Sequence, residues 1–381
     1  MSLDTEPSTW CCRRLHGWAG RSIGHWPIIF CSANRFRFPR KNHAMLFPFS
    51  KLRMHRVPTV AWNSPVSEPL TIGILGANSW IANAAVIPAI NECPNAILGA
   101  SGARSGPIGY PDVLSDPDVD AVYIALANGD HLEWVERAAE AGKHVLCEKP
   151  LAISSSDARR MFEACDAAGV LLAEAYMTPF HPLSIALAAL IDNDDLGEIR
   201  HVASQFTFPL ALPEAGTEIN YRWLTEQGGG ALLDVGIYCL DPVQRILGSG
   251  QLGIEAQITT ADTGIDLTTS AWLRNSAGVT ASVLTSFELP ENQSLQIDGT
   301  AGSLRVDRPF TPGTDGSIFM ITRSDGSIEE HRIEGANCYA LMIGAFVDAV
   351  RGSTPWPRTS VDVLSTIGLC ESIADAGRNK K

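Results

Sequence analysis

The 381-residue chain lacks several features that define whole classes of proteins. It has no apolar run of the roughly 18 residues that a membrane span needs, so we expect no transmembrane segment. Its nine cysteines include no C-x-x-C pair and no His/Cys cluster at metal-ligand spacing, so we expect no metal site. Most of these cysteines stand among apolar residues, which is typical of buried free thiols and favours a reducing, cytoplasmic setting.

Basic residues are scarce over most of the chain. Residues 1–70 hold 10 of the 29 Lys and Arg residues and only three of the 42 Asp and Glu residues, so residues 71–381 carry a net charge of −20. Such an acidic body argues against nucleic acid as the main partner. A chain of this length usually exceeds one core, and we expect two domains after the basic appendage.

The first seventy residues do not show the pattern of a folded domain. They are rich in Arg, Trp, Phe and Pro and have no sustained period of 3.6 or 2 residues. We interpret residues 1–70 as a disordered extension, as a wrongly assigned start with Met45 or Met54 as alternatives, or as a targeting segment. Arg13 and Arg14 could suggest a twin-arginine signal, but no clear apolar stretch follows them.

A strand, a glycine turn and a helix begin the nucleotide-binding domain that we predict over residues 71–193. Residues 71–75 form a buried apolar run, a tight glycine turn follows, and residues 83–90 have a helical pattern. Backbone N–H groups and the helix dipole favour a pyrophosphate at such a junction. The second glycine of the usual motif is missing and the loop is one residue longer, so an ordinary turn is the alternative. The expected cofactor contacts here are Gly76, Asn78, Ser79, Trp80 and Ile81.

The end of the second predicted strand, residues 96–101, favours NADP over NAD. It carries Ser101 where an NAD-binding domain has an acidic residue for the ribose 2′-hydroxyl, and Arg104 follows shortly after. A cation can pair with the 2′-phosphate of NADP. A solvated loop arginine is the alternative, and NAD stays possible.

Polar residues follow the next two predicted strands, over residues 120–127 and 144–147. Strands and helices alternate here, which predicts a parallel, doubly wound sheet that binds ligands at the carboxyl ends of its strands. We therefore expect Ala127, Asn128, His131, Glu148 and Lys149 at the cofactor. A cis Lys149–Pro150 bond would fix the direction of the lysine.

The pattern changes in residues 194–381, which we predict to form a second domain of alternating strands followed by two helices. Within it, Gly228–Gly230 precede a helical run over residues 231–247, so their backbone could lie against a ligand. Asp234 and Tyr238 would share one face of that helix and line a cavity. A buried tyrosine bonded to a capping carboxylate is the alternative.

Three motifs together resemble the Gfo/Idh/MocA oxidoreductase family. They are Glu148-Lys149-Pro150, then Glu-Ala-Tyr-Met at 174–177 with His181-Pro182, and the glycine-rich run 228–238. The chain is most similar to the branch of glucose-fructose oxidoreductase, dimeric dihydrodiol dehydrogenase and NADP-dependent xylose dehydrogenase. The resemblance extends from about Thr71 to the C-terminus.

This resemblance implies an α/β protein, in which a Rossmann domain precedes an α+β domain with a large, open, mostly antiparallel sheet that commonly forms a homodimer. It implies an NADP(H)-dependent oxidoreductase that acts on a carbonyl or hydroxyl carbon of a sugar, polyol or cyclic diol. His181 and Arg222 are then candidate substrate contacts, Arg222 because it forms an N-x-R element with Asn220. A structural turn and a surface ion pair are the respective alternatives.

Two departures from the family pattern affect these expectations. Fewer than twenty residues separate the second strand from Asp120, so we expect the Rossmann domain to be shorter by about one helix–strand unit. Relatives often have an arginine between the Met and the His-Pro of the second motif, whereas this chain has Thr178-Pro179-Phe180. We expect a polar contact to be lost there.

The mechanism that the resemblance implies is hydride transfer at nicotinamide C4, with Lys149, Asp234 and Tyr238 as the catalytic residues. Tyr238 would exchange the hydroxyl proton, Lys149 would polarise the oxygen, and Asp234 would orient the substrate or Lys149. A nearby ammonium stabilises tyrosinate and burial destabilises the ammonium, so we expect the two pKa values to approach the working range. The alternatives are a catalytically silent dinucleotide-binding regulator and an NAD-dependent glycosidase of the same fold.

Overall fold

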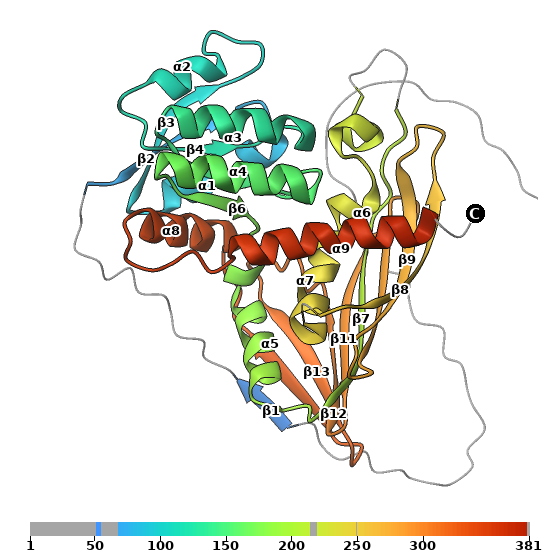
Figure 1. The fold of residues 1–381 in the computed structure, drawn as a ribbon. Coiled ribbons are helices and arrows are strands. Elements are labelled where there is room, and N and C mark those ends of the chain that lie inside the picture. Colours follow the sequence, from blue (N-terminus) through green and yellow to red (C-terminus); the bar gives the residue numbers. More distant parts are fainter. Residues whose placement is uncertain (1–50, 55–67, 214–218, 249, 379–381) are drawn as a thin grey trace, which may run out of the picture. The chain divides into compact units, whose positions relative to one another are not determined.

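The computed structural model describes residues 51–54, 68–213, 219–248 and 250–378. Most of the predicted appendage, residues 1–70, therefore lies outside the described residues. Figure 1 shows the described helices and strands along the chain. None of the helices in these ranges is long and apolar enough to cross a membrane.

A five-stranded parallel sheet forms the core of the first domain. Its strands, in the order β3-β2-β4-β5-β6, are β3 (Ala96–Gly102), β2 (Leu70–Leu75), β4 (Ala121–Ile124), β5 (His144–Glu148) and β6 (Leu172–Ala175). A dinucleotide-binding sheet usually has the order 3-2-1-4-5-6, so the outermost strand is absent and β3 lies at the edge. Only the short helix α2 (Tyr110–Ser115) lies between β3 and β4. The predicted shortening of the Rossmann domain is thus confirmed.

Helices cover both faces of this sheet. Alternate residues of β2 and β4 point to opposite faces, and all four residues of β4 are buried, as is typical of a parallel sheet covered on both sides. Ile74 and Tyr123 pack in the cluster that contains residues of the π-helix η1 (Ala82–Val86), α1 (Ile87–Glu92) and α8 (Cys338–Val350). Ile124 and Val145 pack in the cluster with α3 (His131–Glu140) and α4 (Ser155–Ala168).

A second, nine-stranded sheet forms the other domain, with the order β1-β14-β13-β12-β11-β7-β10-β9-β8. All neighbours are antiparallel except the pairs β10–β7 and β1–β14. The prediction of a large, mostly antiparallel sheet is confirmed. Its strands are β1 (Lys51–Met54), β7 (Ile199–Thr207), β8 (Gly253–Thr260), β9 (Asp266–Arg274), β10 (Thr280–Ser286), β11 (Asn292–Gly299), β12 (Gly302–Asp307), β13 (Ser317–Arg323) and β14 (Ile328–Ile333).

Two helices pack on this sheet and join it to the first domain. α7 (Gly236–Leu247) contacts β7 and β10, and α9 (Ser360–Arg378) contacts both β8 and α4. Val363 and Ile367 of α9 are buried in the core of the first domain, beside Met161. The expected return of the last helix to the first domain is confirmed (Figure 1).

The predicted single helix over residues 231–247 is wrong. The structure has a short helix α6 (Ala231–Asp234), a break at Val235 with φ −112° and ψ −13°, and then α7. The break means that Asp234 and Tyr238 do not share a regular helix face. Asp234 ends α6 and Tyr238 lies in the first turn of α7, so each points into the site from its own element.

Candidate active site

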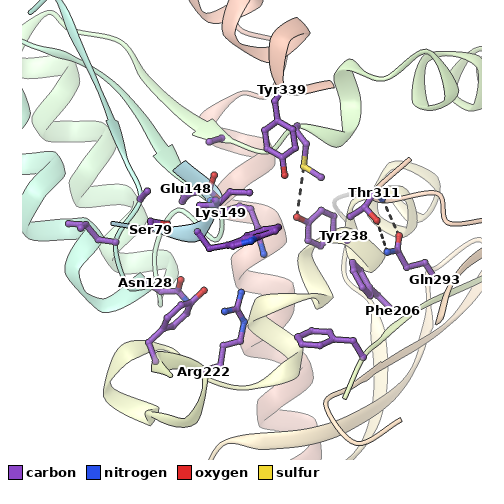
Figure 2. A pocket seen from close by; sticks show the side chains of 18 of the residues that line it. Ser79, Asn128, Glu148, Lys149, Phe206, Arg222, Tyr238, Gln293, Thr311 and Tyr339 are labelled. Atoms are coloured by element: carbon purple, nitrogen blue, oxygen red, sulfur yellow. Dashed lines mark hydrogen bonds between the residues drawn. The ribbon is translucent and has the colours of Figure 1, made fainter. Parts of the chain in front are cut away.

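A cavity of about 650 Å³ lies at the carboxyl ends of the parallel strands, between that sheet and the second domain. This is where open α/β sheets usually bind ligands. The lining residues are Ser79, Trp80, Ile81, Ala125, Leu126, Asn128, Glu148, Lys149, Ala175, Met177, Phe206, Phe208, Tyr221, Arg222, Tyr238, Glu291, Gln293, Thr311 and Tyr339. Figure 2 shows Ser79, Asn128 and Glu148 on one side, Phe206, Gln293 and Thr311 on the other, and Lys149 and Tyr238 between them.

Lys149 is held by Asp234 at the centre of the cavity. The Lys149 Nζ donates to the Asp234 backbone oxygen at 2.9 Å and lies 3.2 Å from Asp234 Oδ1. The same carboxylate accepts two hydrogen bonds from Arg222, at 2.7 Å from Nε and 3.1 Å from Nη2. Of the two roles expected for Asp234, to orient the substrate or to orient Lys149, these contacts favour the second. The predicted cis bond between Lys149 and Pro150 is present.

The Asp234 carboxylate is buried but stays charged. Burial alone would raise its pKa, and the two cations beside it, Lys149 and Arg222, outweigh burial and lower the pKa from 3.8 to about 2. Asp234 is therefore an anion throughout the physiological range. One carboxylate thus fixes two side chains that the sequence places 73 residues apart.

Tyr238 lies beside Lys149, whose ammonium is 4.9 Å from the centre of the phenol ring. The phenol hydroxyl points toward Met177 Sδ, at 3.9 Å, and the ring packs against Tyr176 and Phe206. Burial, followed by the charges of Glu148 and Asp234, raises the pKa of Tyr238 well above 10. The expectation that its pKa falls toward neutrality is therefore wrong for the protein alone, because burial and two carboxylates outweigh the effect of Arg222.

Glu148 lies at the end of β5 next to Lys149, and its carboxylate is anchored on both oxygens. Oε1 accepts a hydrogen bond from the buried Tyr123 hydroxyl at 2.6 Å, and Oε2 accepts one from the Lys149 backbone N–H at 3.2 Å. Burial raises the pKa of Glu148 from 4.5 to about 7, against the opposing effects of Tyr123 and Lys149. Glu148 thus changes its charge near neutral pH.

The turn after β2 has a geometry that fits a dinucleotide. Gly76 has φ +103°, and a side-chain carbon there would lie 2.3 Å from the Ala125 backbone oxygen, so the turn requires glycine. The following helix begins with the π-helical segment η1, which accommodates one extra residue per turn and so suits the longer loop. The Asn83 amide donates to the Ala77 and Ser79 carbonyls at 2.7 and 2.8 Å and fixes that loop. Ser79, Trp80 and Ile81 line the cavity, whereas Gly76 and Asn78 do not.

Besides Gly76 and Asn78, four more expected cofactor contacts lie outside the cavity. His131 is fully buried, and its ring nitrogens face the carbonyls of Pro150, Leu151 and Leu126, so it supports the Lys149–Pro150 turn from behind. Arg104 is exposed and forms an ion pair with Asp130. Ser101, whose hydroxyl contacts the Gly99 carbonyl at 3.4 Å, and Ala127 are the other two.

Of the two candidate substrate contacts, Arg222 lines the cavity and His181 does not. Arg222 lines the cavity and pairs with Asp234, so it is not the surface ion pair of the alternative interpretation. His181 is fully buried and its Nδ1 accepts a hydrogen bond from Leu183 N, which caps the helix α5 (Pro182–Asp192). It does not line the cavity. Thr178, where relatives often have arginine, donates instead to the Phe310 carbonyl at 2.7 Å.

The expectation that the glycine run approaches a ligand is wrong. A side-chain carbon on Gly229 would lie 2.5 Å from the Arg222 carbonyl, and one on Gly230 would lie 2.1 Å from Asp266 Oδ1. Asp266 also accepts a hydrogen bond from Leu232 N and thereby caps α6. Packing of protein against this backbone therefore explains the glycines.

Sequence reasoning missed the residues that the second sheet and α8 contribute. Phe206 ends β7, Gln293 lies on β11, Thr311 follows β12, and Tyr339 lies in the first turn of α8. The Gln293 amide and Thr311 are joined by two hydrogen bonds, of 2.6 and 3.1 Å. The one available signal was a polar Gln293 on the apolar face of β11, where Leu295 and Ile297 follow at alternate positions.

The six cysteines in the described part of the chain are all free and buried, as predicted. In the described part of the chain, no group of three or more His, Cys, Asp or Glu side chains is arranged to hold a metal ion.

Two family models match the chain. Residues 71–176 match the oxidoreductase family with an NAD-binding Rossmann fold, and residues 185–305 match the GFO/IDH/MocA C-terminal domain.

Some relatives match this chain over nearly their whole length, and others over about 60% of it. D-xylose 1-dehydrogenase (NADP(+)) 2 from Haloferax volcanii is 33% identical over 325 residues, which span 81% of this chain and 98% of the relative. Trans-1,2-dihydrobenzene-1,2-diol dehydrogenase from Mus musculus is 31% identical over 53% of this chain and 60% of its own. A solved structure of a 3-ketoreductase from Actinomadura kijaniata, in complex with NADP and TDP-benzene, has a TM-score of 0.74 at 31% identity and covers 81% of this chain and 98% of its own.

Proposed function

Because this chain belongs to the Gfo/Idh/MocA oxidoreductase family, we propose that it transfers a hydride between NADP(H) and a carbonyl or hydroxyl carbon of a sugar, polyol or cyclic diol. The observation that carries this proposal is the meeting of Lys149 and Tyr238 in one cavity, with the ammonium 4.9 Å from the ring centre. A purely structural tyrosine would need no ammonium beside it.

The residues of the first domain fit a dinucleotide. Ser79, Trp80 and Ile81 would hold the pyrophosphate end of the site, and Asn128 and Glu148 would lie toward the nicotinamide. When bound, the nicotinamide supplies or accepts the hydride. Because Arg104 is paired with Asp130 at 2.5 Å, selection of NADP over NAD through Arg104 requires this ion pair to open.

We assign the transfer of the hydroxyl proton to Tyr238 and Lys149. With its raised pKa, the Tyr238 phenol is protonated at neutral pH and can donate a proton to a substrate oxygen in the direction of reduction. Lys149, fixed by Asp234, can replace that proton or polarise the same oxygen. The reverse step, oxidation of a hydroxyl, requires Tyr238 to lose its phenol proton first, so that the phenolate can accept the proton of the substrate.

A thermal-shift experiment on the full chain with NADP(H) and NAD(H), followed by assays of nicotinamide absorbance over a panel of sugars, polyols and diols, tests the proposal. We expect stabilisation by NADP(H) and turnover of at least one compound. Binding without turnover would indicate a silent regulator, and release of sugar from a glycoside without net change in NADPH would indicate a glycosidase.

We also propose a homodimer formed through the open face of the second sheet, in a reducing cytoplasmic compartment. Trp272 of β9 is 46% exposed on this face and stacks on His201 of β7, and Ile318 of β13 is 45% exposed. Exposed apolar residues on a broad sheet are typical of a subunit interface. Size-exclusion chromatography of a Trp272→Lys variant tests this, with a monomer as the expected product.

A further inference from the structure

The described side chains that line the cavity carry no net positive charge. Four charged residues line it, two cations (Lys149 and Arg222) and two carboxylates (Glu148 and Glu291). The buried Asp234 is bonded to both cations. Two charged carboxylates, Asp234 and Glu291, and the partly protonated Glu148 therefore face two cations, and both cations already have a partner.

The side of the cavity farther from the first domain is aromatic and polar, with the exposed Glu291 as its one charged residue among the lining residues. Phe206 and the joined pair of Gln293 and Thr311 provide a ring face, an amide and a hydroxyl (Figure 2). Phe208 lines the same cavity. Because Gln293 donates to the Thr311 oxygen, the Thr311 hydroxyl hydrogen is available for a ligand. Such groups bind hydroxyls and C–H faces. They do not offset the charge of a phosphate.

Phosphate groups are recognised by unpaired Arg or Lys side chains or by converging backbone N–H groups. Here a phosphate on the substrate would lie in a cavity whose two cations are already paired with Asp234 and whose lining includes the carboxylate of Glu291. The negative charge of Glu291 repels a phosphate, and because Glu291 is exposed, solvent screens part of this repulsion.

We propose that the substrate is uncharged, namely a free sugar, polyol or cyclic diol without a phosphate or nucleoside diphosphate group. This inference rests on the proposed function and narrows it. It separates this chain from relatives such as the dTDP-sugar 3-reductase of Streptomyces violaceoruber, which is 34% identical, and groups it with relatives whose names give neutral substrates.

The test compares neutral compounds with phosphorylated or nucleotide-linked counterparts of the same sugar. With NADP(H) and the full chain, kcat/KM is measured for D-glucose and D-glucose 6-phosphate, and for methyl glucoside and dTDP-glucose. We expect each neutral compound to exceed its phosphorylated counterpart by about tenfold or more, because tenfold corresponds to only about 1.4 kcal/mol. A phosphorylated or nucleotide-linked compound that is turned over better than its neutral counterpart would overturn the inference and leave the proposed function intact.

A charge reversal at Glu291 provides a second measurement. Glu291→Lys should raise the ratio of kcat/KM for the phosphorylated compound to that for the neutral one by about tenfold, and salt should reduce this gain. Glu163→Lys makes the same charge change on the exposed surface of α4 and should leave the ratio unchanged. An unchanged ratio in Glu291→Lys would overturn the inference. No turnover with any compound would overturn the proposed function, and the inference with it.

Discussion

The Arg358 guanidinium supports the turn that carries Lys149 through the carboxylate of Glu174. Arg358 Nε donates to Glu174 Oε2 at 2.6 Å, and the other oxygen, Oε1, accepts the backbone N–H of Leu151 at 3.0 Å. Arg358 and Glu174 are both buried, and Arg358 also pairs with Asp241. A segment near the C-terminus thus fixes the backbone two residues after the central lysine.

We expect Arg358→Met to lower the free energy of unfolding by about 3–5 kcal/mol, because the buried Glu174 and the partly buried Asp241 lose their partner. Arg245→Met is the matched control. Its ion pair with Asp192 is half exposed, so removal should cost about 1 kcal/mol or less. Denaturant titrations of both variants measure the difference, and equal losses would show that the buried pair has no special weight.

Lys149→Met and Tyr238→Phe should each lower turnover by about 10² or more, since both remove a group that handles the proton. Binding of NADP(H), measured by thermal shift, should persist in Tyr238→Phe. Steady-state kinetics at saturating cofactor give the result. Near-normal turnover in both variants would refute the catalytic assignment.

Asp234→Asn should remove an acid-dependent part of the stability. The pKa of Asp234 is about 2 in the folded protein and 3.8 as its ordinary value, so the charged carboxylate stabilises the fold above about pH 4. This contribution is lost as the pH falls from 4 toward 2. Melting temperatures of the wild type and the variant should therefore differ most above pH 4 and converge below it. A constant difference would mean that the charge is not the cause.

Glu148→Gln should have the opposite pH dependence. The folded-state pKa of Glu148 is about 7, above its ordinary value of 4.5, so its contribution to stability is complete below pH 4.5 and is lost as the pH rises through 7. The wild type should lose stability relative to Glu148→Gln between about pH 5 and pH 8. Thermal melts over this range check the sign, and a relative gain by the wild type would contradict it.

Gly230→Ala should destabilise the fold by about 1–3 kcal/mol or more. Gly230 has φ +114°, and an added carbon would lie 2.1 Å from Asp266 Oδ1, so strain and a steric clash combine. Gly368→Ala within α9 is the control, because no atom lies within 4 Å of an added carbon and alanine favours the helix by up to about 1 kcal/mol. Denaturant titrations should therefore give opposite signs for the two variants.

Local patterns were sufficient to predict the parallel sheet and the position of Lys149, whereas the missing strand was predicted by comparison with the family pattern. Buried parallel strands have continuous apolar sequences, and ligands gather where they end, so Glu148 and Lys149 could be assigned from their place after β5. The pairing of Asp234 with Lys149 could not be derived from spacing, because the two residues come from different domains. It followed only from family resemblance.

Side-chain direction explains the failures. His131 and His181 have the sequence position of site residues, but each turns inward to bond backbone groups, which a strand-end rule cannot foresee. Gln293 and Thr311 meet through the register of the second sheet, which involves partners far apart in sequence. The break at Val235 has no proline or glycine at the residue itself, so a periodicity argument extends the helix across it.

The pairing of β1 with β14 means that residues 51–54, which precede the first domain, cover an edge of the second sheet. Lys51–Met54 adds a parallel strand at one end of the nine-stranded sheet and satisfies the backbone groups of Glu329–Arg332 on that side. Any version of the chain that starts after Met54 would leave β14 as a bare sheet margin, the kind of surface on which strands of other molecules add and aggregates grow. Removal of the basic residues up to Met54 for expression would thus expose the edge of β14 and favour aggregation.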